Sequence, residues 1–330
     1  MTNYKFKFHP YQRPFKHPLS TSHGQWTVRE GIILSLSDEI GNIGWGEIAP
    51  IPWFGSETLE QAFNFCEQLP QEITTEEIFA IPAQLPCCQF GFESAWELVM
   101  GKGLWTKDFE QSKQHYSYLL PSNQAAKQSW EAPWNQGYRT FKWKIGIAPI
   151  EDEVKIVQEL VEAIPASGQL RLDANGGLTQ QQADQWLMVC DTIGAVEFIE
   201  QPLPPDQFDV MLEMSHNYST AIALDESVAT LDQLEQCYQQ GWRGIFVIKA
   251  AIAGSRKRLR QFCQTYPIDT VFSSALETTI GQQAVLQLAA ELSDFKRAVG
   301  FGVNHWFSQQ LTAKPFSVAD AARTDNSGSL

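Results

Sequence analysis

The stretch Phe141-Lys142-Trp143-Lys144-Ile145-Gly146 places two lysines two positions apart in an apolar run that favours a β-strand. Residues i and i+2 of a strand point to the same face, so Lys142 and Lys144 would lie side by side. If that face is an enclosed interior, each ammonium group disfavours the charge of the other, and at least one lysine pKa should fall well below the free value of roughly 10.4. A lysine pKa near 7–8 (roughly) would suit proton abstraction at neutral pH. An edge strand with two solvated lysines is the alternative interpretation of these six residues.

From residue 116 onward the chain alternates short apolar strands with amphipathic segments such as 151–164 and 179–192. The expected strands are 117–120, 140–145, 169–173, 196–200, 221–225, 245–249, 270–273 and 297–301. Eight strands separated by helices and short loops predict an α/β fold with a TIM-type barrel. A doubly wound open sheet is the alternative, but the sequence contains no GxGxxG or Walker motif that would support a nucleotide site.

The N-terminal part of the chain has a different pattern. Residues from 4 to 50 predict antiparallel strands, and Ser56 is expected to cap a helix over 57–68. Further helices are expected over 75–80 and 92–101, so we expect an α+β capping domain over 1–105 and the barrel over 106–302. The tail, 303–330, would pack back on the capping domain. The loops 18–25 and 49–55 are candidates for a lid over the site.

Composition limits the classes of function. The chain has 330 residues, 43% of them hydrophobic, and a formal net charge of −14, which argues against nucleic acid and anionic membranes as partners. No apolar run approaches the roughly 18 residues of a membrane span, and the six cysteines include no CxxC pair. We therefore expect a cytoplasmic protein with reduced, mostly buried thiols and a small-molecule partner. The sequence does not predict the oligomeric state.

Acidic residues end three successive predicted strands: Asp173, Glu200 and Asp225. The carboxyl ends of parallel strands meet at one rim of a barrel, where the active sites of this fold form. Lys249 ends the next strand, so two lysine-bearing strands would flank the three acids. Three carboxylates without a neighbouring His or Cys suit a hard cation, with Mg²⁺ as the default and Mn²⁺ as its substitute. The alternative is that each acid caps the helix that follows its strand.

Two further choices concern neighbouring residues. Asp225 and Glu226 would face opposite ways in a strand, and Asp225 is preferred as the ligand because it ends the apolar run. Arg171 lies two residues before Asp173, shares its face and is a candidate to bind a substrate carboxylate. Its alternative role is to neutralise the acid cluster.

The KxK pair at 142–144, Leu172-Asp-Ala-Asn175, Glu200-Gln-Pro202 and Lys249 resemble the enolase superfamily, specifically its muconate-lactonizing subgroup. The resemblance spans nearly the whole chain. It implies a modified (β/α)7β barrel with an N-terminal capping domain. It also implies that Lys144 and Lys249 stand on opposite sides of a metal held by the three acids.

The chemistry implied by this resemblance is removal of a proton α to a carboxylate, which forms an enediolate. Lys144 would be the base, Lys142 would lower its pKa, and Lys249 would supply positive charge. Asn175, Ser273, Ser274 and Gly300 are candidate substrate contacts.

Within the subgroup, three segments resemble a dehydratase that eliminates water from a cyclohexadiene carboxylate: 29–31, 171–175 and 273–277. The chain lacks an Asp-x-Asp after the eighth strand, which disfavours a dipeptide epimerase. It also lacks a His-Asp pair after strands six and seven, which disfavours the mandelate-racemase type. An N-acylamino-acid racemase and a non-catalytic binding protein on the same scaffold are the remaining alternatives.

Overall fold

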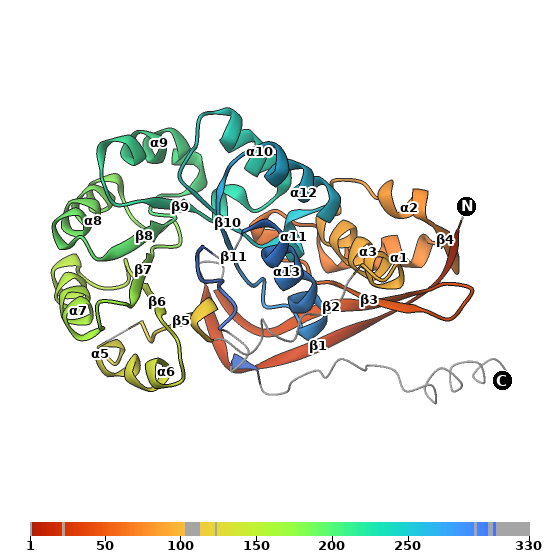
Figure 1. Ribbon diagram of the computed structural model, residues 1–330, viewed down its shortest axis with the longest axis horizontal. Helices are drawn as coiled ribbons and strands as arrows, with labels where there is room; N and C mark the ends of the chain where they lie inside the picture. The colour runs from red at the N-terminus through yellow and green to blue at the C-terminus, as the bar shows by residue number, and fades with distance from the viewer. Residues whose placement is uncertain are drawn as a thin grey trace.

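The computed structural model describes residues 2–21, 24–102, 113–122, 124–293, 296–302 and 306–307. Two sheets organise these residues: an antiparallel sheet of four strands and a parallel sheet of seven. Figure 1 shows the antiparallel sheet, in red and orange, running beside the parallel one, with helices along the outer side of the parallel strands.

The capping domain is built on the antiparallel sheet, in the strand order β3-β2-β1-β4. Its strands are β1 (Asn3–Thr21), β2 (Gly24–Ser37), β3 (Ile43–Ile48) and β4 (Glu72–Thr74). Its helices are α1 (Leu59–Gln68), α2 (Thr75–Phe79) and α3 (Pro86–Val99). The helix α3 lies directly on β3 because β3 carries glycine at the contact. A Cβ at Gly44 would lie 1.8 Å from the Ala95 carbonyl oxygen, so no larger residue fits there.

The predicted start of the first helix was wrong. Thr58, not Ser56, caps α1, because its hydroxyl accepts from the Gln61 N–H while the Gln61 side chain accepts from the Thr58 N–H. The Ser56 hydroxyl accepts instead from the Ile51 N–H at 2.8 Å, which closes the 49–55 loop. The capping box between Thr58 and Gln61 satisfies two backbone donors at once, which one serine could not do.

The barrel strands lie in the order β11-β10-β9-β8-β7-β6-β5 and all pair in parallel. They are β5 (Ser117–Leu119), β6 (Thr140–Lys144), β7 (Gln169–Asp173), β8 (Val196–Glu200), β9 (Ile222–Leu224), β10 (Ile245–Ile248) and β11 (Asp269–Phe272). The helices between or after them are α5 (Ala126–Ser129), α6 (Glu131–Asn135), α7 (Ile150–Ala163), α8 (Gln180–Ile193), α9 (Phe208–Asn217), α10 (Leu231–Gln239), α11 (Ala250–Ala253), α12 (Arg256–Thr265) and α13 (Thr279–Leu292). Seven predicted strands are thus confirmed to within one or two residues.

The expected eighth strand is reduced to two single bridges. Gly300 pairs with Ser273, just after β11, and Val299 pairs with Tyr116, just before β5. The segment therefore links the two edges of the seven-stranded sheet. Arg297 supports it with ion pairs to Glu197 at 2.6 Å and Asp269 at 2.7 Å. This arrangement confirms the modified barrel with an N-terminal α+β capping domain.

No described helix has both the length and the hydrophobicity that a membrane span requires. All six cysteines are free, and five of them are buried. Of the C-terminal tail only 306–307 is described, and there Phe307 bridges to Phe15 of β1 and stacks on its ring at 4.7 Å. The rest of the tail, and the expected domain boundary near 105, lie outside the described residues.

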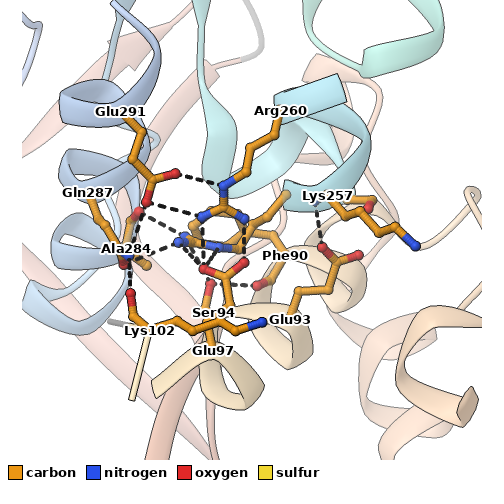
Figure 2. A network of polar contacts seen from close by, with 12 residues as sticks. Phe90, Glu93, Ser94, Glu97, Lys102, Lys257, Arg260, Ala284, Gln287 and Glu291 are labelled. Carbon is orange, nitrogen blue, oxygen red and sulfur yellow. Dashed lines mark hydrogen bonds and ion pairs between the residues drawn. The ribbon is translucent and has the colours of Figure 1, made fainter. Parts of the chain in front are cut away.

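Buried ion pairs join the capping domain to the barrel. Arg256 of α12 is 1% exposed, and its guanidinium donates to Glu97 of α3 at 2.7 and 3.0 Å. Figure 2 shows Glu97 facing Arg260, which also pairs with Glu291 of α13 at 2.7 Å. One carboxylate from the capping domain therefore pairs with two arginines of the barrel. Burial and ion pairing fix the position of the capping domain on the barrel.

We predict that Glu97→Gln destabilises the protein by about 3 kcal/mol or more, because Arg256 would stay buried without its counter-charge. Urea unfolding near pH 7 measures the loss. The matched control is Lys155→Met, which breaks an exposed pair to Asp152 whose side chains are 69% and 64% exposed. It should cost no more than about 1 kcal/mol. Equal losses in the two variants would contradict the structural role of Glu97.

Candidate active site

The lysines of β6 point into the barrel rather than to solvent. The Lys142 Nζ lies 2.7 Å from Asp173 Oδ2 and 2.6 Å from Glu200 Oε1, so it bridges the ends of β7 and β8. Backbone register explains this contact, since Asp173 pairs with Glu200 across the two strands. The edge-strand alternative for the KxK stretch is therefore wrong.

The expected effect on the lysine pKa is reversed for Lys142. Burial by itself would lower the pKa of its ammonium group, but the charges of Asp173, Glu200 and Asp225 outweigh burial and raise that pKa above its ordinary value. The neighbouring strands bring acids to Lys142 that the local sequence around the two lysines does not contain. Lys142 is a fixed positive charge in this structure.

Lys144 differs from Lys142 in its surroundings. It is half-buried, and its Cα pairs in register with that of Asp173 on β7. Among the residues that the structure describes, its ammonium group has no hydrogen-bond or ion-pair partner. The role of Lys144 as the base stays a prediction.

Lys249 closes the other side of the site. It follows β10 directly, and its ammonium group is paired with Asp225, which follows β9 by one residue. The ring of Phe54 lies over the same ammonium group, with the Nζ 4.3 Å from the ring centroid. Phe54 belongs to the 49–55 loop of the capping domain, in the 3₁₀ turn Pro52–Phe54. The predicted lid loop therefore reaches the predicted catalytic rim.

The rim holds four acids, Asp173, Glu200, Asp225 and Glu226. Among the described residues, two lysines, Lys142 and Lys249, form ion pairs with them. Burial raises the pKa of Glu200, and Asp173 and Asp225 raise it further against the opposing effect of Lys142. Burial likewise raises the pKa of Asp225 against the opposing effect of Lys249. Glu226 is half-buried, and its buried Oε2 has no hydrogen-bond partner among the described residues. Additional positive charge at this rim would stabilise the ionised acids.

The donor chemistry of the site fits Mg²⁺. Among the described residues no three His, Cys, Asp or Glu side chains are already gathered closely enough to hold a metal ion. The ammonium groups of Lys142 and Lys249 lie against the acids instead. Even so, the rim offers only buried carboxylate oxygens, one of them without a partner, and such oxygens are the ligands that Mg²⁺ prefers. The assignment of Asp173, Glu200 and Asp225 as ligands stays a prediction.

Gln201 organises the rim and was not singled out by the sequence analysis. It is fully buried, and its φ of 39° turns the chain sharply after Glu200. Its side-chain oxygen accepts from the Asp225 N–H at 2.9 Å, and its nitrogen donates to Ser227 Oγ at 2.7 Å. Gln201 thereby ties the end of β8 to the end of β9. Only its place after Glu200 in the Glu-Gln-Pro motif marked it in the sequence.

Arg171 is held one layer below the rim. Its Nε donates to Glu197 at 2.6 Å and its Nη1 donates to the Ala298 carbonyl at 2.7 Å. The guanidinium therefore binds two neighbouring segments of the barrel and neutralises Glu197. These contacts favour the charge-neutralising role over the substrate-binding role, although the partner acid is Glu197 rather than the rim cluster.

The remaining predicted substrate contacts lie on two loops. Asn175 has a φ of 46° and its amide nitrogen contacts Glu226 Oε1 at 3.3 Å, so it belongs to the acid rim. Ser273 and Gly300 form a backbone bridge, and Ser274 donates to Gly300 through its N–H at 3.0 Å. These three residues therefore sit together where the barrel closes. Their contact with a substrate stays a prediction.

Two family models match the chain. The model described as "Enolase C-terminal domain-like" matches residues 124–328, and the model described as "MenC, N-terminal domain" matches residues 3–98. The first match covers more than half of the chain.

The chain belongs to the enolase superfamily.

Several proteins of this superfamily are similar to this chain in sequence or in fold. An o-succinylbenzoate synthase from Thermosynechococcus vestitus is 40% identical over 311 residues, which cover 93% of this chain and 95% of the relative. A crystal structure of o-succinylbenzoate synthase from Thermosynechococcus elongatus, with Mg in its active site, matches with a TM-score of 0.87 and 38% identity. That match covers 97% of this chain and 98% of the other. An N-succinyl Arg/Lys racemase from Bacillus cereus (TM-score 0.78, 17% identity, covering 96% and 92%) shares the fold alone.

Glu277 lies at the end of the loop 273–277, which follows β11. Its Oε2 accepts from the Ala275 N–H at 2.6 Å and from Ser274 Oγ at 3.1 Å, while its Oε1 has no hydrogen-bond partner among the described residues. Burial, aided by the charge of Glu47, raises the pKa of this carboxyl to about 7. Glu277 therefore keeps its proton to a higher pH in the folded protein than in the unfolded chain.

We predict a pH-dependent stability difference between the wild type and Glu277→Gln. Because the folded pKa lies above the unfolded value, the folded state binds the extra proton, and the wild type loses stability as pH rises from about 4.5 to about 7. The variant cannot ionise, so its stability relative to the wild type should rise over that window and stay level above it. Urea midpoints from pH 4.5 to 8.5, at matched ionic strength, measure the difference. A constant difference across the window would contradict the raised pKa.

Proposed function

We propose that this chain is an o-succinylbenzoate synthase, a carbon–oxygen lyase of menaquinone or phylloquinone biosynthesis that acts in the cytoplasm on a small-molecule carboxylate. The observation that carries the proposal is Lys144, an ammonium group without a partner among the described residues, beside three buried acids at the barrel rim. The 40% identity to a synthase over nearly the full length of both chains supports the choice within the superfamily.

The reaction breaks a C–H bond next to the substrate carboxylate and the C–O bond of the neighbouring hydroxyl. Lys144 in its neutral form takes the proton from carbon. The same ammonium group then protonates the departing hydroxyl, which leaves as water while the cyclohexadiene ring becomes aromatic. One residue therefore acts first as base and then as acid. Aromatisation makes the elimination favourable.

Asp173, Glu200 and Asp225 are the residues that would hold Mg²⁺, with Mn²⁺ as a substitute. When bound, the ion supplies positive charge where the substrate carboxylate gains electron density as the proton leaves. Lys142 is already engaged with two of these acids, so it offsets their charge rather than moving protons.

Lys249 serves the reaction as a fixed positive charge. Asp225 and the Phe54 ring hold its ammonium group in place. A group held on both sides is well suited to electrostatic stabilisation and poorly suited to carrying a proton between substrate faces. This difference between Lys144 and Lys249 favours a lyase over an N-acylamino-acid racemase, whose two lysines must both exchange protons.

We predict an absolute requirement for Mg²⁺ or Mn²⁺ in the dehydration assay. Exhaustive chelation should abolish activity, and re-addition of Mg²⁺ should restore it. Bound metal should also raise the melting temperature by mass action, which provides a readout independent of catalysis. Asp173→Asn should weaken both effects. Full activity after chelation would contradict the metal assignment.

We predict that the lysine variants separate proton transfer from charge. Lys144→Ala and Lys144→Arg should each lower kcat/KM by about 10³-fold or more, because a guanidinium keeps its proton near neutral pH and cannot act as base. Lys249→Ala should lower kcat/KM by about 10²–10³-fold, and Lys249→Arg should retain part of the activity because it keeps the charge. The exposed Lys155→Ala is the control and should match the wild type.

The assay follows dehydration of the cyclohexadiene carboxylate, with deuterium analysis of recovered substrate. Activity in Lys144→Arg together with none in Lys249→Arg would reverse the assignment of the base. A racemase would be indicated by N-acylamino-acid substrates that exchange solvent deuterium at both faces and depend on both lysines.

A further inference from the structure

Arg29 of β2 is a buried cation whose guanidinium donates hydrogen bonds to four main-chain oxygens. It is 1% exposed, and its Nη1 donates to the carbonyls of Pro50 at 2.7 Å and of Glu30 at 2.9 Å. Its Nη2 donates to the carbonyl of Ala49 and, at 3.2 Å, to that of Ala275. One side chain thus binds the lid loop 49–55 of the capping domain and the loop 273–277 of the barrel.

Only a guanidinium could make this set of contacts. Arginine presents five N–H donors in a rigid planar fork, whereas the lysine ammonium is a single point with three donors. Burying a charge without a counter-charge is costly, so the four carbonyls must offset that cost. The ring of Trp26 lies 5.4 Å from the Arg29 Cζ and adds a cation–π contact.

Both of the loops bound by Arg29 form walls of the proposed site. The 49–55 loop places the Phe54 ring over the Lys249 ammonium group. Trp26, which lies against Arg29, also meets Trp53 edge-on at 4.9 Å. The 273–277 loop carries Ser273 and Ser274, and Leu276 within it has a φ of 62°, a left-handed conformation that a leucine keeps only when its neighbours hold it.

We propose that Arg29 is a positioning residue that sets the distance between these two walls. It touches no reacting group and acts through Phe54 on Lys249 and through Ala275 on the serine loop. The inference rests on the proposed function, since it assigns Arg29 a part in that reaction. It predicts that loss of the fork loosens both loops and misplaces the groups that hold the substrate and Lys249.

The experiment compares Arg29→Lys with the wild type in kinetics and in hydrogen exchange without substrate. Arg29→Lys keeps the charge and loses the fork, and kcat/KM per folded molecule should fall about 10- to 100-fold, as small misplacements of reacting groups do. Exchange should accelerate in segments 49–58 and 273–278 and stay unchanged in α7 and α8. The matched control is Arg243→Lys, whose guanidinium donates to two carbonyls at 2.7 Å away from the site. It should change neither readout.

A second variant tests the route of the effect. If Arg29 acts through Phe54, the double variant Arg29→Lys/Phe54→Leu should be no more than about threefold worse than the poorer single variant. Additive losses would overturn this route. Unchanged kcat/KM in Arg29→Lys, with only a lower melting temperature, would overturn the positioning role and leave a structural one.

The outcomes also separate this inference from the proposed function. In one outcome the wild type does not dehydrate the substrate, but hydrogen exchange in Arg29→Lys is faster in both loops. The proposed function then fails, and the link that Arg29 makes between the two loops stands. If Arg29→Lys does not fold, hydrogen exchange of the wild type tests the link instead. The protection factors of the Gly55 and Ala275 N–H groups should agree within about tenfold, because one side chain holds both loops. A larger difference would overturn the link.

Discussion

The structure depends on keeping several charged groups buried at one rim of a barrel. The acids at the ends of β7, β8 and β9 lie within a few per cent of full burial, and burying a charge without a compensating charge is costly. Lys142 and Lys249 offset part of that charge, and the remaining deficit suits a divalent cation. The geometry of the site therefore follows from charge compensation. Each charged group keeps its position because it lies against groups of the opposite charge.

The capping domain is joined to the barrel by the same kind of interaction. Arg256 and Arg260 of the barrel share Glu97 of the capping domain, while Arg29 of the capping domain binds a barrel carbonyl. Glu47 of β3 accepts from the N–H groups of Thr278 and Gly281 and so caps the start of α13. Because these contacts are buried and directional, the capping domain cannot slide on the barrel without leaving charges or donors unpaired. The contact between Phe54 of the 49–55 loop and Lys249 depends on this fixed position of the capping domain.

Relatives that share this fold have different activities. The B. cereus racemase matches this fold at 17% identity, so the scaffold alone does not select a reaction. In the proposed function, the reaction is selected by which lysine is available to move a proton and by the loops that hold the substrate. In this chain Lys144 has no partner among the described residues and Lys249 is held on two sides, an asymmetry that suits elimination of water.

The sequence by itself determined the barrel and the members of its rim. Strands of a parallel barrel end on one side, so the positions of Asp173, Glu200 and Asp225 after apolar runs were enough to predict that they meet. It did not determine what each charged group binds, because partners come from strands and loops far apart in the chain. Lys142 was expected to repel Lys144 and instead binds two acids, and Arg171 binds Glu197. Arg29 and Gln201 owe their roles to contacts across segments that no local pattern encodes, and only the tertiary structure could decide them.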